Sequence, residues 1–203
     1  MSCSIYDFDD TLFITNSRIN ILNKQREIIK SYTSSEYRDF YDEVKAHLKD
    51  GNDIDFSEFD EDEIDEFELI EIMVNNLTKK YHSNSDIYIL TSRGTEPEYL
   101  QRFIFNTTNI LLPLENIITV NNSIIFERII KTIKNNPLYE KLKETQHISS
   151  VKKVMALIMI MKKRYRYVDF FDDDYKNIKA MEDNIESIKT CFPHTMVHLH
   201  HII

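Results

Sequence analysis

The chain has 203 residues, of which 42% are apolar and 29% are charged, and its formal net charge is −9. This composition fits one soluble globular domain with a modest insertion, and the acidic balance argues against sequence-independent binding to a nucleic-acid backbone. Two cysteines, Cys3 and Cys191, offer no disulfide framework. Because no signal peptide or bilayer-spanning run is visible either, we expect a cytoplasmic protein without a membrane partner.

Short apolar runs that are rich in β-branched residues recur along the chain between helical patterns. They occupy residues 3–6, 86–90, 117–120, 165–171 and 196–199. This alternation predicts an α/β domain with a mainly parallel central sheet. The first two runs are separated by far more than the roughly 12 residues that a simple crossover needs, which predicts an insert between them.

The insert, residues 16–82, is predicted to be helical. Apolar residues recur at helical spacing over 37–48, after a Thr33/Glu36 pair that is placed as a capping box. A second stripe covers 64–81, and an earlier helix is expected to contain the apolar residues of 21–29. We therefore expect a small helical module that covers the front of the sheet.

Three carboxylates stand directly after the first predicted strand, in the segment Asp7-Phe-Asp9-Asp10-Thr-Leu. Side chains alternate faces along an extended chain, so Asp7 and Asp9 point the same way and their like charges repel. Such a pair is costly unless a cation, a proton or a reaction requires it. The segment therefore indicates a functional site.

Three later segments belong with this one. Thr91 follows the second apolar run, Lys152 and Lys153 open an apolar helix, and the cluster 172–174 of three aspartates follows the fourth run. In an open parallel sheet, the carboxyl ends of the strands and the amino ends of the following helices share one rim. Acids, hydroxyls and a lysine that meet at this rim are typical of a metal-assisted phosphoryl-transfer site.

In this order, the four segments resemble the motifs of the haloacid dehalogenase (HAD) superfamily, over nearly the whole chain outside the insert. The resemblance implies a Rossmann-like three-layer fold with a catalytic core at 1–15 and 83–203, and a cap formed by the insert. It also implies Mg²⁺ and a phosphoaspartyl intermediate. The family is chemically broad, so the substrate does not follow from the resemblance.

Residue roles follow from the same resemblance. Asp7 would be the nucleophile, and Asp9 would be the general acid and then the base that activates water. The Thr91 hydroxyl would hold a phosphoryl oxygen, and a lysine would neutralise charge on the phosphoryl group and on Asp7. Lys153 is favoured for this role, with Lys152 as the alternative, because counting from Lys153 places buried helix positions on larger apolar residues.

The metal set follows from the resemblance as well. Mg²⁺ would lie between the Asp7 carboxylate, the Asp9 carbonyl oxygen and Asp173, and Asp172 would support the site. These are the hard oxygen ligands that this ion prefers.

Other polar residues either allow two interpretations of their role or are better explained by a structural role. Arg93 could contact phosphate or pair with surface acids. The basic run 162–166 could indicate nucleic-acid binding, but helix-end cations on the opposite rim explain it better. His198 and His200 share a face of the last strand. Without an acid or cysteine partner nearby, a terminal edge strand is favoured over a metal site.

The sequence therefore predicts a Mg²⁺-dependent phosphomonoester hydrolase that acts on a nucleotide or a small phosphorylated metabolite. Asp9 favours hydrolysis over dehalogenation, and the lack of a membrane segment argues against a transport ATPase. One alternative is a phosphatase that removes 3′- or 5′-phosphates from nucleic-acid ends, against which the net charge counts mildly. Another is a catalytically idle HAD fold that serves as a binding module. The oligomeric state is left open.

Overall fold

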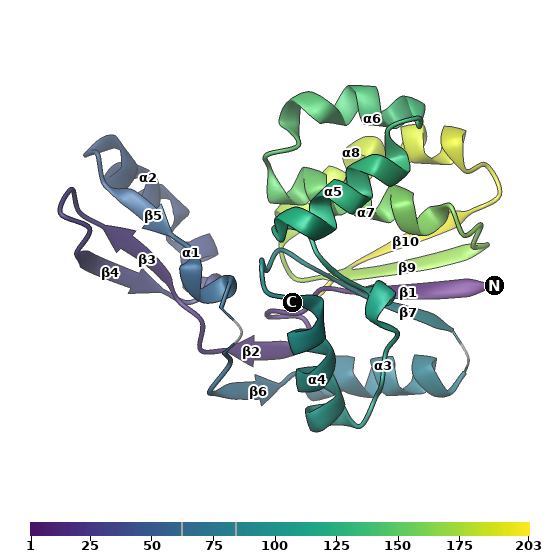
Figure 1. The fold of residues 1–203 in the computed structure, drawn as a ribbon, viewed down its shortest axis with the longest axis horizontal. Helices are drawn as coiled ribbons and strands as arrows, with labels where there is room; N and C mark the ends of the chain where they lie inside the picture. Colours follow the sequence, from purple (N-terminus) through teal and green to yellow (C-terminus); the bar gives the residue numbers. More distant parts are fainter. Residues whose placement is uncertain (62, 84) are drawn as a thin grey trace.

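Five parallel strands form the central sheet of the computed structural model, which describes residues 1–61, 63–83 and 85–203 (Figure 1). In spatial order the strands are β10 (Met196–His201), β9 (Tyr167–Asp172), β1 (Ser2–Tyr6), β7 (Asp86–Thr91) and β8 (Ile117–Thr119). Each lies on one of the predicted runs, so the prediction of an α/β fold with a mainly parallel sheet is confirmed. The central strand β1 pairs in parallel with β7 and β9, and Ile5 lies between Tyr88 and Phe170.

Helices cover both faces of this sheet, which gives a Rossmann-like three-layer arrangement (Figure 1). One layer contains α5 (Ser123–Ile133), α6 (Pro137–Leu142), α7 (Ser149–Met161) and α8 (Tyr175–Cys191). The other contains α3 (Glu71–His82) and α4 (Pro97–Thr108). Short 3₁₀ turns are η2 (Leu114–Asn116) and η3 (Lys143–Thr145).

Local sequence explains where several helices begin. The side chains of Asn122, Asn136 and Asp174 accept hydrogen bonds from the first backbone N–H groups of α5, α6 and α8. Pro97 occupies the first turn of α4, where its missing N–H costs nothing. Helix α7 is apolar on nearly every side and is therefore buried between its neighbours. This packing fixes the position of its first turn near the carboxyl ends of the strands.

The insert leaves the sheet through a two-stranded stem, β2 (Phe13–Thr15) and β6 (Phe67–Leu69), and forms a lobe at one end of the molecule (Figure 1). The lobe contains an antiparallel sheet in the order β4-β3-β5, two helices and a 3₁₀ turn. Their bounds are β3 (Ile19–Leu22), β4 (Ile28–Tyr32), β5 (Asp53–Asp55), α1 (Ser34–Asp39), α2 (Tyr41–Lys49) and η1 (Ser57–Phe59).

The prediction of helices throughout the insert is wrong in two places. Residues 21–29 form the β3–β4 hairpin, whose turn is closed by the Asn23 side chain accepting from the backbone N–H of Gln25 and Glu27, each at 2.9 Å. The stripe 64–81 divides into strand β6 and helix α3. The helix predicted after Thr33 is present with its capping box, but it is broken at Phe40 into α1 and α2.

Helix α3 packs on the central sheet rather than on the lobe. Its Met73 and Leu77 belong to the same buried apolar cluster as Ile87 and Ile89 of β7. The end of the predicted insert therefore contributes to the three-layer core. Among the described residues, no helix combines the length and the apolar character needed to cross a bilayer.

Candidate active site

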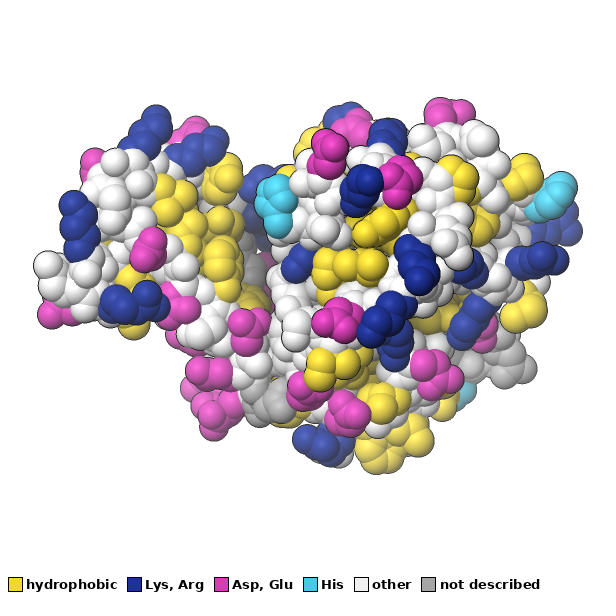
Figure 2. Space-filling view, turned by 45° about the horizontal axis from the view of Figure 1, so that its top comes forward, with side chains coloured by type: hydrophobic (Ala, Val, Ile, Leu, Met, Phe, Trp, Pro, Cys, Tyr) yellow, Lys and Arg dark blue, Asp and Glu magenta, His cyan; other side chains and the backbone are white. Residues whose placement is uncertain are grey.

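A crevice of about 560 Å³ lies between the lobe and the carboxyl ends of the central strands. Figure 2 shows a notch between the lobe and the rest of the molecule, with hydrophobic side chains gathered on the side of the lobe that turns toward it. The predicted site residues in its lining are Asp7, Asp9, Thr91, Lys152, Lys153 and Asp173. The topology therefore brings the four predicted segments together, since each lies at the end of a central strand or at the start of α7.

Lys153 lies between two carboxylates beneath the floor of this crevice. Its Nζ is 3.0 Å from Asp7 Oδ1 and 2.7 Å from Asp172 Oδ2, and the residue is fully buried. Lys152 instead donates to Asn121 Oδ1 at 2.9 Å near the mouth. Of the two candidate lysines, the structure places Lys153 at Asp7.

Burial is the largest single influence on the pKa of each residue of this pair, but only at Asp7 does it set the direction of the shift. It raises the pKa of Asp7 to about 8, because Lys153 only partly offsets the cost of burying a charge and the nearby Asp172 and Asp9 add to that cost. Burial alone would lower the pKa of Lys153, but the two carboxylates beside it outweigh this effect and raise the pKa. Lys153 is therefore held in its charged form.

The acidic residues offer a fitting set of oxygens for a divalent cation. One carboxylate oxygen from each of Asp7, Asp172 and Asp173 lies within 4.8 Å of the others. Asp172 is already occupied, since it accepts from Lys153, from Asn177 Nδ2 at 2.9 and 3.1 Å and from the backbone N–H of Asp174 at 2.9 Å. Within the described chain, Asp7 Oδ1 and Asp173 Oδ2 are buried and receive no well-aligned hydrogen bond, and each is instead in an ion pair, with Lys153 and Arg38 respectively. Hard oxygen donors of this kind suit Mg²⁺, with Asp7 and Asp173 as the available ligands.

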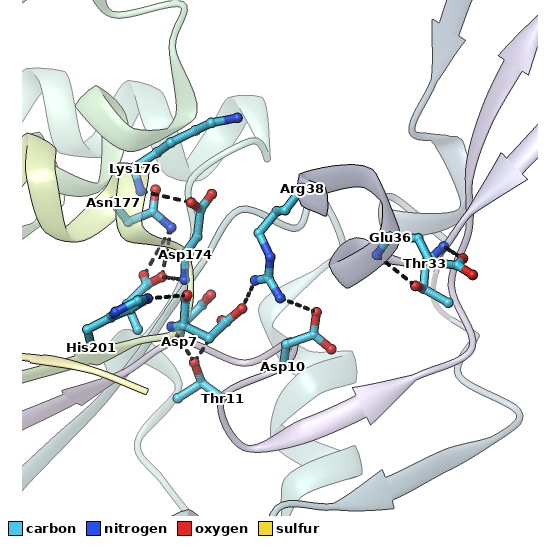
Figure 3. A network of polar contacts seen from close by, with 12 residues as sticks. Asp7, Asp10, Thr11, Thr33, Glu36, Arg38, Asp174, Lys176, Asn177 and His201 are labelled. Carbon is cyan, nitrogen blue, oxygen red and sulfur yellow. Dashed lines mark hydrogen bonds and ion pairs between the residues drawn. The ribbon is translucent and has the colours of Figure 1, made fainter. Parts of the chain in front are cut away.

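Arg38, on helix α1 of the lobe, reaches into the crevice and ends on this acidic group (Figure 3). Its guanidinium forms an ion pair with Asp173 Oδ2 and contacts Asp10 Oδ2 at 3.3 Å. Asp10 adopts a left-handed backbone conformation, with φ of 56°, where the chain turns from β1 into the stem. Sequence reasoning missed Arg38, because its position depends on how the lobe folds over the sheet.

Asp9 is held by Arg93, a fully buried side chain from the loop after β7. The guanidinium donates to Asp9 Oδ2 at 2.9 Å through Nε and to Asp9 Oδ1 at 2.7 Å through Nη2. Thr15 also donates to Asp9 Oδ1, at 2.8 Å. Of the two roles left open for Arg93, the structure shows pairing with an acid, but the acid is Asp9 of the site rather than one on the surface.

The same loop ties the lobe to the sheet. Arg93 Nη2 donates to Ser17 Oγ at 2.9 Å, and its guanidinium lies 5.0 Å from the centre of the Phe59 ring. The backbone N–H of Gly94 donates to the Phe59 carbonyl at 3.1 Å. A Cβ on Gly94 would overlap the Asp60 carboxylate, so a larger residue at this position would displace the Asp60 side chain.

The basic run 162–166 lies between α7 and β9, at the opposite end of the strands, and Lys162 donates to the Thr132 carbonyl near the end of α5 at 2.6 Å. This supports the helix-end interpretation.

The histidines lie on β10, which is an edge strand as predicted, but the expectation that they have no acid partner is wrong. His198 Nδ1 and His200 Nε2 are each 3.3 Å from Asp169 Oδ1, and Lys80 donates to Asp169 Oδ2 at 2.9 Å. Burial would raise the pKa of Asp169, but the hydrogen bonds from Lys80 and His200 outweigh it and hold the pKa below its usual range.

Comparison of the chain with protein-family models, with curated proteins and with solved structures finds no match. The chemistry of the site therefore has to be inferred from its geometry. The crevice combines a buried carboxylate beside a fixed ammonium group, a second carboxylate held by a guanidinium, a buried hydroxyl and a group of three carboxylates whose oxygens could hold a cation.

Proposed function

We propose that the protein is a Mg²⁺-dependent phosphomonoester hydrolase of the haloacid dehalogenase type. The observation that carries this proposal is the convergence of Asp7, Lys153 and Asp173 in one crevice. One carboxylate oxygen from each of Asp7, Asp172 and Asp173 lies within 4.8 Å of the others. A buried carboxylate beside a fixed ammonium group suits nucleophilic attack on a group that brings its own negative charge. Two free cysteines agree with a reducing compartment such as the cytoplasm.

In the first step, Asp7 attacks the phosphorus atom of the substrate. A bond forms between an Asp7 carboxylate oxygen and phosphorus, and the bond from phosphorus to the leaving oxygen breaks. The leaving oxygen takes a proton from the Asp9 carboxyl group. Arg93 donates to both Asp9 oxygens and therefore favours the carboxylate, so Asp9 must take up this proton as the substrate binds. After the transfer, Arg93 stabilises the carboxylate that remains.

In the second step, the phosphoaspartyl group is hydrolysed. Asp9, now a carboxylate, takes a proton from water as the water oxygen bonds to phosphorus, and the bond from phosphorus to Asp7 breaks. This returns both carboxyl groups to their starting states and releases phosphate. Lys153 stays charged throughout, since its two carboxylate neighbours raise its pKa, and it offsets negative charge on Asp7 and on the phosphoryl group.

Asp7 and Asp173 would hold Mg²⁺, with the Asp9 carbonyl as a further oxygen donor, and Asp172 would keep Lys153 in place. When bound, the ion supplies positive charge against the phosphoryl oxygens. The Thr91 hydroxyl lines the same crevice and is the candidate to hold a phosphoryl oxygen.

Replacement of the nucleophile tests the proposal most directly. We expect Asp7→Asn to lower kcat for p-nitrophenyl phosphate by about 10⁴-fold or more, because the amide oxygen is a far weaker nucleophile. The change is nearly isosteric, so the circular dichroism spectrum should be unchanged. Activity of the unchanged protein should disappear in EDTA and return with Mg²⁺.

Asp10→Asn is the matched control, since Asp10 follows the same strand but contacts only Arg38 among the site residues described above. It should retain activity within about tenfold. Beryllofluoride, which mimics an aspartyl phosphate, should protect the unchanged protein against heat but not Asp7→Asn. Full activity of Asp7→Asn would contradict the mechanism, and no turnover of any phosphomonoester by the unchanged protein would favour the idle binding module.

A further inference from the structure

The wall of the crevice that belongs to the lobe is built of aromatic side chains. Tyr37, Tyr41, Phe56 and Phe59 all line it. The Tyr37 ring meets Phe56 edge to face, with centroids 5.7 Å apart and an angle of 77° between the ring planes, and it meets Tyr41 in the same way at 5.8 Å and 70°. The rings are thus fixed at steep angles to one another and form a rigid corner.

Two of these rings already have cations as partners. The Lys176 ammonium lies 3.8 Å from the centre of the Tyr41 ring, and the Arg93 guanidinium lies 5.0 Å from that of Phe59. Phe56 is 43% exposed although it lines a crevice. The free aromatic surface on this wall is therefore offered by Phe56, supported at its edge by Tyr37.

The opposite wall comes from the core and is polar apart from Ile148, which is 43% exposed. Asn121, Ser149 and Lys152 line it, and Lys152 donates to Asn121 Oδ1 at 2.9 Å. The Ser149 hydroxyl and the Asn121 side chain lie 3.3 Å apart. Amide, hydroxyl and ammonium groups thus face the aromatic corner across the crevice, and Asp7 and Thr91 lie in the same cavity.

We propose that the crevice binds a nucleoside phosphate, with the phosphate at Asp7 and the base against Phe56 and Tyr37. The inference rests on the proposed function, because it assigns Asp7 to the phosphoryl end. A flat base matches an aromatic wall, and its polar edges and the ribose hydroxyls match the facing wall. A sugar phosphate would leave the Phe56 ring without a flat partner. A lipid phosphate would place its apolar tail against Asn121, Ser149 and Lys152. The volume of about 560 Å³ lies within the range of pockets that hold ligands of this size.

Binding to the Asp7→Asn variant tests the inference without turnover. By calorimetry in the presence of Mg²⁺, adenosine and cytidine monophosphates should bind at least tenfold more tightly than ribose 5-phosphate or glycerol phosphate. Phe56→Ala should remove most of this difference, weakening nucleotide binding about tenfold while changing ribose 5-phosphate binding less than twofold. Phe56→Tyr should restore nucleotide binding to within threefold.

Phe40→Ala is the control for the lobe, because Phe40 is similarly exposed at 50% but lies outside the crevice lining. It should change nucleotide binding less than twofold. Equal binding of nucleotides and ribose 5-phosphate, or equal losses for both in Phe56→Ala, would overturn the inference. Absence of hydrolysis by the unchanged protein would overturn the proposed function instead, and these binding experiments would still decide the inference.

A nucleoside phosphate could be a free mononucleotide or the end of a strand. Short oligonucleotides that carry a 3′- or 5′-phosphate, compared with the mononucleotides in the same titration, distinguish these sources. Tighter binding of either class, with the same loss in Phe56→Ala, agrees with the inference. An affinity for oligonucleotides that is the same with and without the terminal phosphate would contradict it.

Discussion

The central sheet and the lobe differ in how much apolar material each encloses. The sheet is covered on both faces by extended clusters of buried side chains. The lobe has a cluster in which Ile21, Tyr32 and Val44 are buried, with Tyr37 and Ile54 packed against them. A cluster of this size provides little stability by itself. The lobe therefore depends on its attachment to the core for its position.

This difference separates the tasks that the two regions would perform in the proposed reaction. The groups assigned to chemistry, Asp7, Lys153 and Asp173, lie on the rigid sheet and on buried α7. The lobe contributes Arg38 and the aromatic corner, which line the same crevice but are supported by a much smaller apolar cluster. The groups assigned to chemistry thus lie where packing is dense, and the contacts from the lobe come from a region where the apolar core is small.

The largest expected effect comes from removing the buried ammonium group of Lys153 from the core. Lys153→Met should lower the free energy of unfolding by about 3–5 kcal/mol, because Asp7 and Asp172 would remain buried without their shared partner. Urea denaturation in EDTA would measure this. Lys152→Met is the matched control and should cost less than about 0.5 kcal/mol, since its ammonium lies near the mouth. Equal losses for the two variants would contradict the assignment.

Removing the Arg38 guanidinium of the lobe should have a smaller effect, and this effect should be a gain in metal affinity. Arg38 pairs with Asp173, so its guanidinium would compete with Mg²⁺ for that carboxylate in the proposed enzyme. We expect Arg38→Gln to tighten Mg²⁺ binding about tenfold, or ~1.4 kcal/mol, by calorimetry without substrate. Arg18→Gln, which removes an exposed arginine of the lobe that pairs with Glu36, is the control and should have no effect. Weaker binding in Arg38→Gln would show that Arg38 supports the metal site rather than competing for it.

The smallest expected effect is the pH dependence of metal binding. The pKa of Asp7 is raised to about 8, so below this pH the metal-free carboxyl binds a proton that Mg²⁺ must displace. Affinity should therefore fall as pH falls, by about fivefold from pH 8 to pH 7. Calorimetry in buffers of different ionisation enthalpy should detect release of up to one proton. Affinity that is unchanged between pH 7 and pH 8 would contradict the raised pKa.

The core was predictable from the sequence because its signals are local. Apolar runs end directly at Asp7, at Thr91 and at Asp172, and the topology of a parallel sheet then brings these ends to one rim. No tertiary information was needed for these strand ends. Lys153 was favoured over Lys152 because the apolar spacing along α7 fits the helix that the family resemblance implies, and the structure then distinguished the two.

The lobe was less predictable, because its strands are short and its partners are distant. Residues 21–29 contain apolar residues at spacings that also fit a helix, whereas pairing with β5 favours strands. Asn23, which closes the hairpin turn through its side chain, was the local signal that could have indicated it. No local pattern could have placed Arg38 at Asp173, because that contact depends on the orientation of the whole lobe.

The attachment through Arg93 and Gly94 bears on how such a protein can evolve. These residues fix the base of the lobe through Ser17 and Phe59, and Arg93 simultaneously holds Asp9. Segments farther out, from β3 to β5, lie beyond this junction. A lineage that retains the junction can therefore exchange these outer segments, and with them Tyr37 of the proposed base-binding wall, while the arrangement of Asp7, Asp9 and Lys153 is inherited unchanged.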